Sequence, residues 1–505
     1  MGKACRDKRI RSLLLAHHND DQAETVLLRL VRGQGGFGLK SIQSSAEIPD
    51  CWGQHGVHQS GFREDNLLWR STNDLDSSRK DQEEGRSVLD DRQVITKPPI
   101  YFEDGGIRIY RPLLKFSKDR LQSTCHHYRI QWVEDETNQD ASRTPRNAVR
   151  QLLNSGKLPK ALQKSSLLAV VERVQKRSAD RMLHAGKLFH RTQILMFDPR
   201  AGMLIVRMPA RVVPTERVSE AVLEGELKNY RFEASLFLRS LLEIVSPEEK
   251  ISLQQLEFAL CSIFPDLDDP EATAVDKRIL PSNFTTQGVQ FQRCISPIEG
   301  TDSRHIEDQE DLDPEFIWVL TRQPAWLLRY PTPSLPLIPI SSAPNNFSPN
   351  SSSTFYPWHL FDGRFWIRVS HSSPQPLEIR LPKPTDIATL RESFRGTPQR
   401  PYVESRWKRA APGKIRFTLP IIAEAGEGGR VLAMPTLGIS APGVKRELNL
   451  RWEVRYKKVD WKGKWVTMAG RRKGSGKQRF LEGGDRAEKR NSWSEESGGK
   501  RRSFR

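Results

Sequence analysis

Cysteine is scarce in this 505-residue chain, and long apolar runs are missing from it. An odd number of scattered cysteines, with no Cys-x-x-Cys pair, indicates a reducing compartment and argues against a disulfide scaffold. No run approaches the 18 apolar residues that a membrane helix needs, so we expect no membrane partner. The five cysteines are Cys5, Cys51, Cys125, Cys261 and Cys294.

Hydrophobic residues are also few, at 37% of the chain, whereas glycine and proline number 33 each. This composition predicts packed domains separated by disordered insertions. Basic residues number 80 against 62 acidic ones, which gives a net charge of +18. Such a charge favours a polyanionic partner, and nucleic acid fits better than an anionic membrane surface.

Ionisable side chains are densest at residues 16–25, Ala-His-His-Asn-Asp-Asp-Gln-Ala-Glu-Thr. An apolar run, 10–16, precedes this stretch, and a helical pattern, 26–31, follows it. A strand, a polar turn and a helix form the layout in which α/β sheets present ligand sites, because free N–H groups point there. The alternative is a capped helix start, with Asn19 as N-cap and acids in the first turn.

Two further segments carry candidate binding groups. Gly33, Gly35 and Gly38 match G-x-G-x-x-G, but they follow a helix, so we interpret them as a helix end and loop rather than a dinucleotide fingerprint. In 130–156, Trp132 and Val133 predict a short buried strand, and Pro145 predicts a helix start. Arg146 and Arg150 would share one face of that helix, as a solvated end or as a clamp on phosphate or RNA.

The rest of the chain predicts the following organisation. Residues 43–99 predict a disordered insertion rich in Ser, Gln, Asp and Glu, in which Cys51, His55 and His58 lack a fourth metal ligand. Between residues 100 and 264 we expect mostly helix: a strand at 106–110, helices at 117–129 and 158–188, a hairpin around 198–202, and helices at 231–245 and 251–264. After residue 264 we expect mostly strands: a strand at 316–320, a Pro-rich loop at 331–350, an Asp362-Gly363 hairpin, and strands at 377–381 and 415–419. Residues 471–505 predict a disordered basic tail.

Three motifs in this order resemble those of the tRNA(Ile)-lysidine synthetases, members of the PP-loop ATP-pyrophosphatase group. They are the opening stretch 16–25, Tyr-Arg-Pro-Leu-Leu at 110–114, and Trp-Val-Glu-Asp-Glu-Thr-Asn at 132–138 followed by Pro-Arg-Asn-Ala-Val-Arg at 145–150. The resemblance covers residues 8–180 firmly and the remainder weakly. It implies an α/β fold, with an incomplete Rossmann-like parallel sheet in a partial catalytic domain at 1–156. A mainly helical domain at 157–264 and a β-rich C-terminal region at 265–470 would follow.

The resemblance also implies a function and site residues. The reaction would be ATP-dependent ligation of free lysine to the wobble cytidine of an isoleucine tRNA, through an adenylated intermediate, with ATP and Mg²⁺ as cofactors. It implies catalytic roles for Asp21 and Arg146, in which Asp21 would hold Mg²⁺ or orient and deprotonate the lysine amine; we expect no dedicated metal-ligand set in the chain. His17, His18, Asp20, Arg32 and Gly33 would lie on the ATP and Mg²⁺ side, and Arg111, Asn147 and Arg150 would bind tRNA.

The chain departs from this family in one motif, because no Ser-Gly-Gly-x-Asp-Ser occurs in it. That PP-loop would bind pyrophosphate through backbone N–H groups. We therefore expect a chain truncated at its N-terminus, or a degenerate descendant, and in either case no lysidine synthesis by the sequence as written. Alternatives are another PP-loop tRNA-modifying enzyme, such as a thiolation ligase, and a basic RNA-binding protein without catalysis. We expect a mitochondrial location, with the cytoplasm as the alternative, and a homodimer is one option for the oligomeric state.

Overall fold

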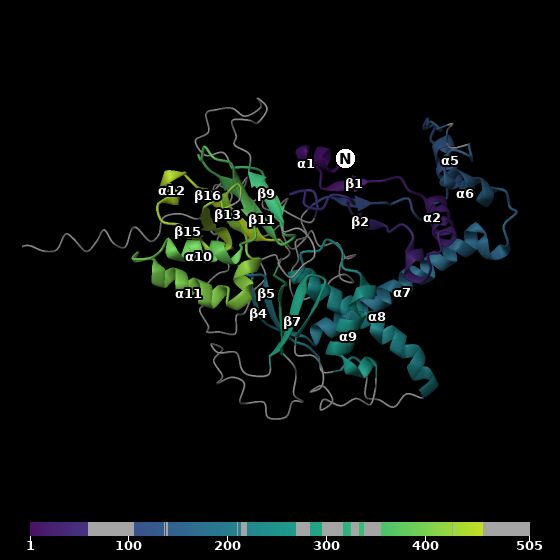
Figure 1. Cartoon of the computed structure of the whole chain (residues 1–505). Helices are drawn as coiled ribbons and strands as arrows, with labels where there is room; N and C mark the ends of the chain where they lie inside the picture. The colour runs from purple at the N-terminus through teal and green to yellow at the C-terminus, as the bar shows by residue number, and fades with distance from the viewer. Residues whose placement is uncertain are drawn as a thin grey trace, which may run out of the picture.

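The computed structural model describes residues 1–58, 106–135, 137, 140–209, 211–213, 220–268, 283–294, 317–324, 333–337, 355–426 and 428–457. Helices and strands alternate in a mixed α/β architecture, which confirms the predicted fold class at that level (Figure 1). The predicted basic tail, 471–505, lies outside the described residues.

A small sheet lies near the N-terminus. Strand β1 (Ser12–Leu14) pairs in parallel with β3 (Arg108–Tyr110), while β2 (Ser45–Glu47) pairs antiparallel with β3 on its other side. One parallel pair is therefore present, within a sheet of mixed direction. Its core contains Ile109 of β3 and Ile107, which precedes that strand, together with Cys5 of α1 (Gly2–Asp7).

The start of the predicted insertion is ordered, contrary to the sequence-based expectation. Residues 43–58 contain β2 and a turn whose Cys51 and Val57 are buried in the core of the small sheet. Polar composition alone concealed this, because β2 is only three residues long and needs only a few apolar contacts to be held. Residues 59–99 lie outside the described part of the chain.

The sequence predicted the starts of two of the helices that follow, at Ser117 and Pro145, whereas the helix expected at 158–188 begins at Lys164. Helix α5 (Lys118–His127) is capped by the Ser117 hydroxyl, which accepts a hydrogen bond from the Arg120 N–H at 3.3 Å. Helix α6 begins at its proline, where a missing N–H costs nothing. Helices α2 (Asn19–Val31), α6 (Pro145–Asn154) and α7 (Lys164–His190) bury a shared apolar cluster of Ala23, Val26, Leu27, Val149, Leu167 and Val171.

The predicted boundary near residue 264 is not a boundary between a helical and a β-rich domain. The predicted hairpin is present as β4 (Gln193–Asp198) and β5 (Met203–Arg207), but β5 continues into a five-stranded antiparallel sheet. That sheet has the order β4-β5-β8-β7-β6, and its other strands lie beyond residue 264. They are β6 (Asn283–Thr286), β7 (Val289–Cys294) and β8 (Ile317–Arg322); α8 (Glu220–Val245) and α9 (Glu257–Ile263) precede them.

Two further sheets form the C-terminal part. The Asp362-Gly363 turn joins β10 (His359–Phe361) to β11 (Phe365–Ser370), and both turn residues have positive φ, as this hairpin type requires. The strand expected at 415–419 is wrong, because a 3₁₀ helix occupies residues 413–418 and the strand follows it. The remaining elements are β9 (Ser334–Leu337), β12 (Leu377–Arg380), β13 (Ile421–Glu424), β14 (Val431–Met434), β15 (Ile439–Ser440), β16 (Arg451–Tyr456), α10 (Pro384–Glu392), α11 (Arg400–Ala410) and α12 (Val444–Glu447).

Strand β9 also differs from the sequence-based prediction of a Pro-rich loop at 331–350. It pairs antiparallel with β12, and Pro336 lies opposite Glu378. Proline lacks the N–H that an inner strand would donate, so its place on the last strand of the β15-β14-β13-β12-β9 sheet is physically reasonable.

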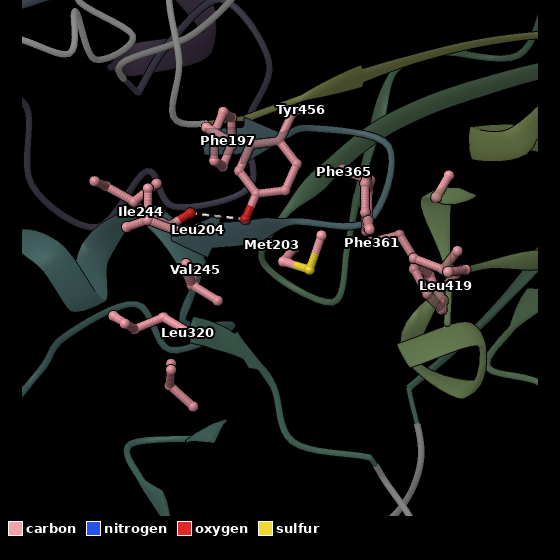
Figure 2. Packing of buried hydrophobic residues seen from close by; sticks show 14 of the residues in the cluster. Phe197, Met203, Leu204, Ile244, Val245, Leu320, Phe361, Phe365, Leu419 and Tyr456 are labelled. Atoms are coloured by element: carbon pink, nitrogen blue, oxygen red, sulfur yellow. Dashed lines mark hydrogen bonds between the residues drawn. The ribbon is translucent and has the colours of Figure 1, made fainter. Parts of the chain in front are cut away.

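One apolar core joins the elements from α7 to β16, here called the body. Tyr456 of β16 packs edge-to-face against Phe197 of β4 and Phe365 of β11, with ring centroids 5.3 Å apart in each pair. Its hydroxyl donates a hydrogen bond of 2.7 Å to the Ile244 carbonyl of α8 (Figure 2). The C-terminal strand is therefore fixed to the helical part of the same core.

A turn after β2 connects the small sheet to the body. His55 stacks on Trp358 with ring centroids 5.3 Å apart, and it contacts the Trp366 ring edge-on at 4.9 Å. Its Nε2 lies 3.1 Å from a guanidinium nitrogen of Arg455. Burial and the nearby Arg455, Arg368 and Arg6 lower the pKa of His55 to about 3, so the ring is a neutral hydrogen-bond acceptor.

Candidate functional site: the N-terminal end of helix α2

The dense stretch 16–25 forms the start of α2. The capped helix start and the ligand site, which the sequence offered as alternatives, are compatible there. The N-cap is His18 rather than Asn19, and the His18 N–H donates to the Asp21 carboxylate at 2.9 Å. This hydrogen bond to a residue in the first turn is part of a capping-box arrangement and satisfies the His18 backbone N–H. The helix start is capped, and it also forms ion pairs that a cap does not require.

Arg146 of α6 is the centre of those contacts. Its Nη2 donates to Asp21 Oδ1 at 2.6 Å, and its Nε donates to Glu24 Oε2 at 2.7 Å. Arg150, one turn further along α6, donates from Nε to Glu24 Oε1 at 2.7 Å. Two motifs more than 120 residues apart in the sequence therefore meet in one network of charge-assisted hydrogen bonds.

Burial differs sharply within this network. The Glu24 side chain is 3% exposed and Asp21 is 13% exposed, whereas Arg146 and Arg150 are 38% and 30% exposed. The hydrogen bond from Arg150 to Glu24 raises the pKa of the guanidinium, which stays charged in any case. The carboxylates thus hold the two guanidinium groups in place, and the outer sides of those groups face solvent.

Asp20 has a separate set of partners from Arg146 and Arg150. Lys164, the first residue of α7, forms an ion pair with it, and the Lys118 N–H of α5 donates to it at 2.8 Å. Burial would raise the pKa of Asp20, but hydrogen bonds from His18, Lys164 and Lys118 outweigh burial and lower it. Asp20 therefore ties together the starts of three helices.

His17 and Arg111 lie on the strand side of this helix start. Burial lowers the pKa of His17, and Arg111 and Arg146 lower it further against the opposing effect of Asp21. Arg111 donates from Nη1 to the Gln43 carbonyl at 2.9 Å, which holds it beside β2. Within the described residues, several buried polar atoms here have no hydrogen-bond partner: His17 Nδ1, Asn19 Oδ1, Gln22 Oε1 and Arg111 Nε. These four atoms leave hydrogen-bonding capacity that a bound water or ligand could use.

The resemblance implied that Asn147 contacts tRNA, but in the structure its side chain is bound to the protein itself. Its side chain is 6% exposed, and its amide nitrogen donates to the carbonyls of Thr137 and Asp140, at 2.9 Å in each case. Both amide hydrogens are used in this way. Asn147 therefore fixes the polar loop that precedes α6 and leaves the guanidinium groups to face a ligand.

Arg32 and Gly33 lie away from the other predicted ATP-side residues. Arg32 is the C-cap of α2, eleven residues after Asp21, so the two are about 16 Å apart along the helix axis. Both Arg32 and Gly33 are exposed. The structure brings Asp21, His17, His18, Asp20 and Arg111 together but separates these two residues from them.

The predicted buried strand at Trp132 and Val133 is also absent. The two side chains are 41% and 96% exposed, and residues 131–135 form neither helix nor strand. An apolar pair predicts burial only when another element covers it. Here the His126 ring of α5 covers Trp132 only in part, with ring centroids 4.7 Å apart, and no described element buries Val133. Neighbouring Glu134 nevertheless reaches the site region, because it pairs with Lys118 at 3.1 Å.

Two contributors were missed by sequence reasoning. Glu24 stands three residues after Asp21, so the helical period places both on one face, and this signal was available. Lys164 could not be found in this way, because its contact with Asp20 depends on how α7 packs against α2. Sequence reasoning interpreted Lys164 as part of the polar face of a long helix.

The residues at this helix end suit an anionic ligand better than a bound metal ion. Arg111, Arg146, Arg150 and Lys164 surround the N-terminal end of α2, where the helix dipole also favours anions. Both carboxylate oxygens of Asp20, Asp21 and Glu24 already accept hydrogen bonds or ion pairs. In the part of the chain that the structure covers, no group of three His, Cys, Asp or Glu side chains could hold a metal ion.

A comparison with known families identifies this domain. A PP-loop domain family matches residues 1–51 and 100–156, which include α2, β3 and α6 and leave out most of the predicted insertion. The match therefore covers the segments that build the candidate site.

Relatives with assigned names agree with this match. A probable tRNA(Ile)-lysidine synthase of Schizosaccharomyces pombe is 23% identical over 442 residues, which cover 87% of this chain and 71% of that protein. The tRNA(Ile)-lysidine synthase of Wolbachia pipientis wMel is 27% identical over 184 residues, 36% of this chain and 29% of that protein. A short segment of 33 residues is 67% identical to the tRNA(Ile)-lysidine synthase of Geobacter sulfurreducens, 6% of this chain and 7% of that protein. The chain contains a PP-loop domain and is a homologue of the tRNA(Ile)-lysidine synthases, as its three motifs predicted.

Proposed function

We propose that this protein is a tRNA-modifying ligase that joins free lysine to the wobble cytidine of an isoleucine tRNA, using ATP. One observation carries the proposal: Arg146 bridges Asp21 and Glu24 at the start of α2. The bridge unites two of the motifs that resemble the lysidine synthetases, and both lie within the PP-loop match. The names of the relatives support the same reaction.

The site offers the charges that such a reaction requires. The oxygen at position 2 of cytidine is a poor leaving group, and ATP supplies the adenylation that makes it a good one. Arg146 and Arg150 would neutralise phosphate charge with guanidinium groups that are already oriented by Glu24. Asp21 would orient the lysine amine, which must lose a proton before it can attack.

ATP binding accords with the PP-loop match, and Mg²⁺ is a further part of the proposal. The carboxylates of Asp20, Asp21 and Glu24 are committed to cations of the protein. Mg²⁺ would therefore be held mainly by phosphate oxygens and water, with at most one of these carboxylates as a ligand. This mode is common for Mg²⁺, which gives up its water reluctantly.

The proposal extends to the arrangement of the sheet and to the location of the protein in the cell. We infer a Rossmann-like parallel sheet, of which β1 and β3 form one pair. We further propose a mitochondrial location, with the cytoplasm as the alternative. Fluorescence microscopy of the tagged gene product tests the location, and cytoplasmic signal alone would overturn it.

The function is tested on the purified 505-residue chain with an isoleucine tRNA whose wobble base is cytidine. ATP-dependent transfer of labelled lysine to that tRNA, lost in Asp21→Asn and kept in Lys3→Gln, would support the ligase. The missing Ser-Gly-Gly-x-Asp-Ser segment predicts no transfer by the sequence as written, so this assay decides between that expectation and the ligase. No binding to the tRNA would overturn the proposal entirely.

A second function has its own support. The net charge of +18 favours a protein that binds RNA, and such binding does not require catalysis. Tight tRNA binding without lysine transfer, and without ATP binding, would favour this alternative. Filter binding of labelled ATP provides that last measurement.

A further inference from the structure

The outer face of α7 carries a row of basic side chains that the candidate site does not use. Within residues 164–191 there are seven Lys and Arg residues and two acids, Glu172 and Asp180, so the segment has a net charge of +5. Lys164 pairs with Asp20 and Arg181 pairs with Glu233. The other five are exposed, and no salt bridge engages them within the described residues; they are Arg173, Lys176, Arg177, Lys187 and Arg191, here called the α7 stripe.

The helical period places these five cations together. Arg173, Lys176 and Arg177 are three and four residues apart, so their side chains are neighbours on the helix surface. Arg191 stands eighteen residues, or five full turns, after Arg173 and returns to the same angle. The stripe is therefore about 27 Å long and lies on one side of the helix.

The other side of α7 is committed to the fold. Leu167 and Val171 are buried against α2 and α6, while Leu188 and Phe189 belong to the core of the body. A helix that binds membranes needs a large free apolar face, and α7 has used its apolar residues in packing. The stripe is thus a polar surface, suited to a partner with regularly spaced negative charges.

The position of α7 relates the stripe to the candidate site. Its first residue, Lys164, contacts Asp20 at the start of α2, and the helix runs from the α2–α6 group to α8 (Figure 1). Arg173 lies about 14 Å along the helix axis from Lys164, so the stripe begins about 14 Å from the residue that contacts the site. A small substrate bound at α2 could not reach it, but an extended polyanion could.

We propose that the α7 stripe binds the sugar–phosphate backbone of the double-helical stem next to the tRNA loop that is modified. This inference rests on the proposed function, because it takes the tRNA as substrate. The stripe contacts phosphates and holds the stem along α7 while the loop reaches the N-terminal end of α2. Recognition is through charge and shape, since phosphate contacts position a nucleic acid without reading its sequence.

The test compares two triple variants of the full chain in tRNA binding. Arg173→Gln, Lys176→Gln and Arg177→Gln together remove three neighbouring cations of the stripe. Lys3→Gln, Lys8→Gln and Lys250→Gln remove three exposed cations from other places. Equal thermal unfolding profiles of both variants would show that neither change disturbs the fold.

Salt dependence provides the main readout. Each lost phosphate contact reduces the slope of log K against log salt by about 0.7–0.9, so the stripe variant should lose roughly two to three from its slope. Its affinity for the tRNA at 0.1 M salt should fall on the order of ten- to a hundredfold, while the control variant changes less than about twofold. The isolated stem-loop should show the same difference, and the single-stranded loop should not.

Each result has a distinct meaning. An unchanged slope in the stripe variant, with normal tRNA binding by the wild type, overturns the inference and leaves the proposed function standing. Failure of the wild type to bind tRNA overturns the proposed function itself. Loss of binding to vesicles that contain anionic lipid, with tRNA binding retained, would assign the stripe to a membrane surface and contradict the proposal.

Discussion

Buried charge has different roles in the body and in the N-terminal part that holds the small sheet and the start of α2. In the body, Asp362 lies between Arg322 and Arg364, and all three side chains are at most 3% exposed. At the start of α2, Glu24 is buried to the same degree, but Arg146 and Arg150 are about one-third exposed. The first arrangement is enclosed and can act only on stability, whereas the second presents its cations to solvent. The difference indicates where chemistry can occur.

Removal of Asp362 should have the largest effect on stability. Asp362→Ala leaves Arg322 and Arg364 buried without a counter-charge, so the free energy of unfolding should fall by about 3–5 kcal/mol. Urea denaturation measures this change. The matched control is Glu392→Ala, whose pair with Arg395 is exposed and should contribute less than about 1 kcal/mol. Similar midpoints for both variants would contradict the enclosed role of Asp362.

Apolar truncation should distinguish the two cores. Phe237 is fully buried in the body, so Phe237→Ala should lower the free energy of unfolding by about 3–5 kcal/mol. Ile109 is buried in the small sheet, and Ile109→Ala should cost about 2–3 kcal/mol there because that core is small. Hydrogen exchange should show that Phe237→Ala reduces protection both in the body and in residues 1–58 and 106–156. Ile109→Ala should reduce protection in residues 1–58 and 106–156 alone. A single cooperative transition in both variants would show that the halves unfold together.

Removal of the Glu24 charge should affect binding more than stability. Glu24→Gln keeps the shape but releases Arg146 and Arg150, and the partly exposed guanidinium groups should limit the stability loss to about 1–2 kcal/mol. Affinity for tRNA should fall at least about tenfold, because the oriented cations are lost. Fluorescence anisotropy with labelled tRNA measures the affinity. A variant with normal affinity would contradict the assignment of this network to a ligand site.

Acid should weaken the contact between the halves by the smallest amount. The pKa of His55 is about 3 in the folded protein and near 6.5 when unfolded, so protonation favours the unfolded state. The stability held by neutral His55 is complete above about pH 7 and is lost as the pH falls from 6.5 towards 3. At pH 5 the loss should be about 1–2 kcal/mol. His55→Gln should reduce the difference between urea midpoints at pH 7 and pH 5; an unchanged difference would argue against this role.

Local signals in the sequence predicted local structure well. Ser117 and Pro145 mark helix starts, and Asp362-Gly363 marks a hairpin, because caps and turns depend on residues within a few positions. The five-stranded sheet of the body could not be predicted in this way. Its pairing of β5 with β8 joins residues more than 100 positions apart, and neither strand carries a mark of the other.

The candidate site shows the same limit. The motif at 16–25 identified the right helix end, and the motif at 145–150 identified Arg146 as a partner. The ion pair of Asp20 with Lys164 depends on tertiary packing, and the 1.5 Å rise per residue places Arg32 at the far end of α2. Exposure of Trp132 and Val133 also depends on which elements cover them, which no local pattern specifies.

The turn after β2 has a consequence for protein engineering. The Ile107 N–H donates to the Val57 carbonyl at 3.0 Å, and the Ile48 N–H donates to the Ile107 carbonyl at 3.2 Å. The chain therefore leaves the small sheet after His58 and re-enters it at Gly106 at nearly the same point. Because loop closure depends only weakly on loop length, a reporter domain inserted between residues 59 and 99 should leave the register of β2 against β3 unchanged. This junction is a suitable insertion site for another domain.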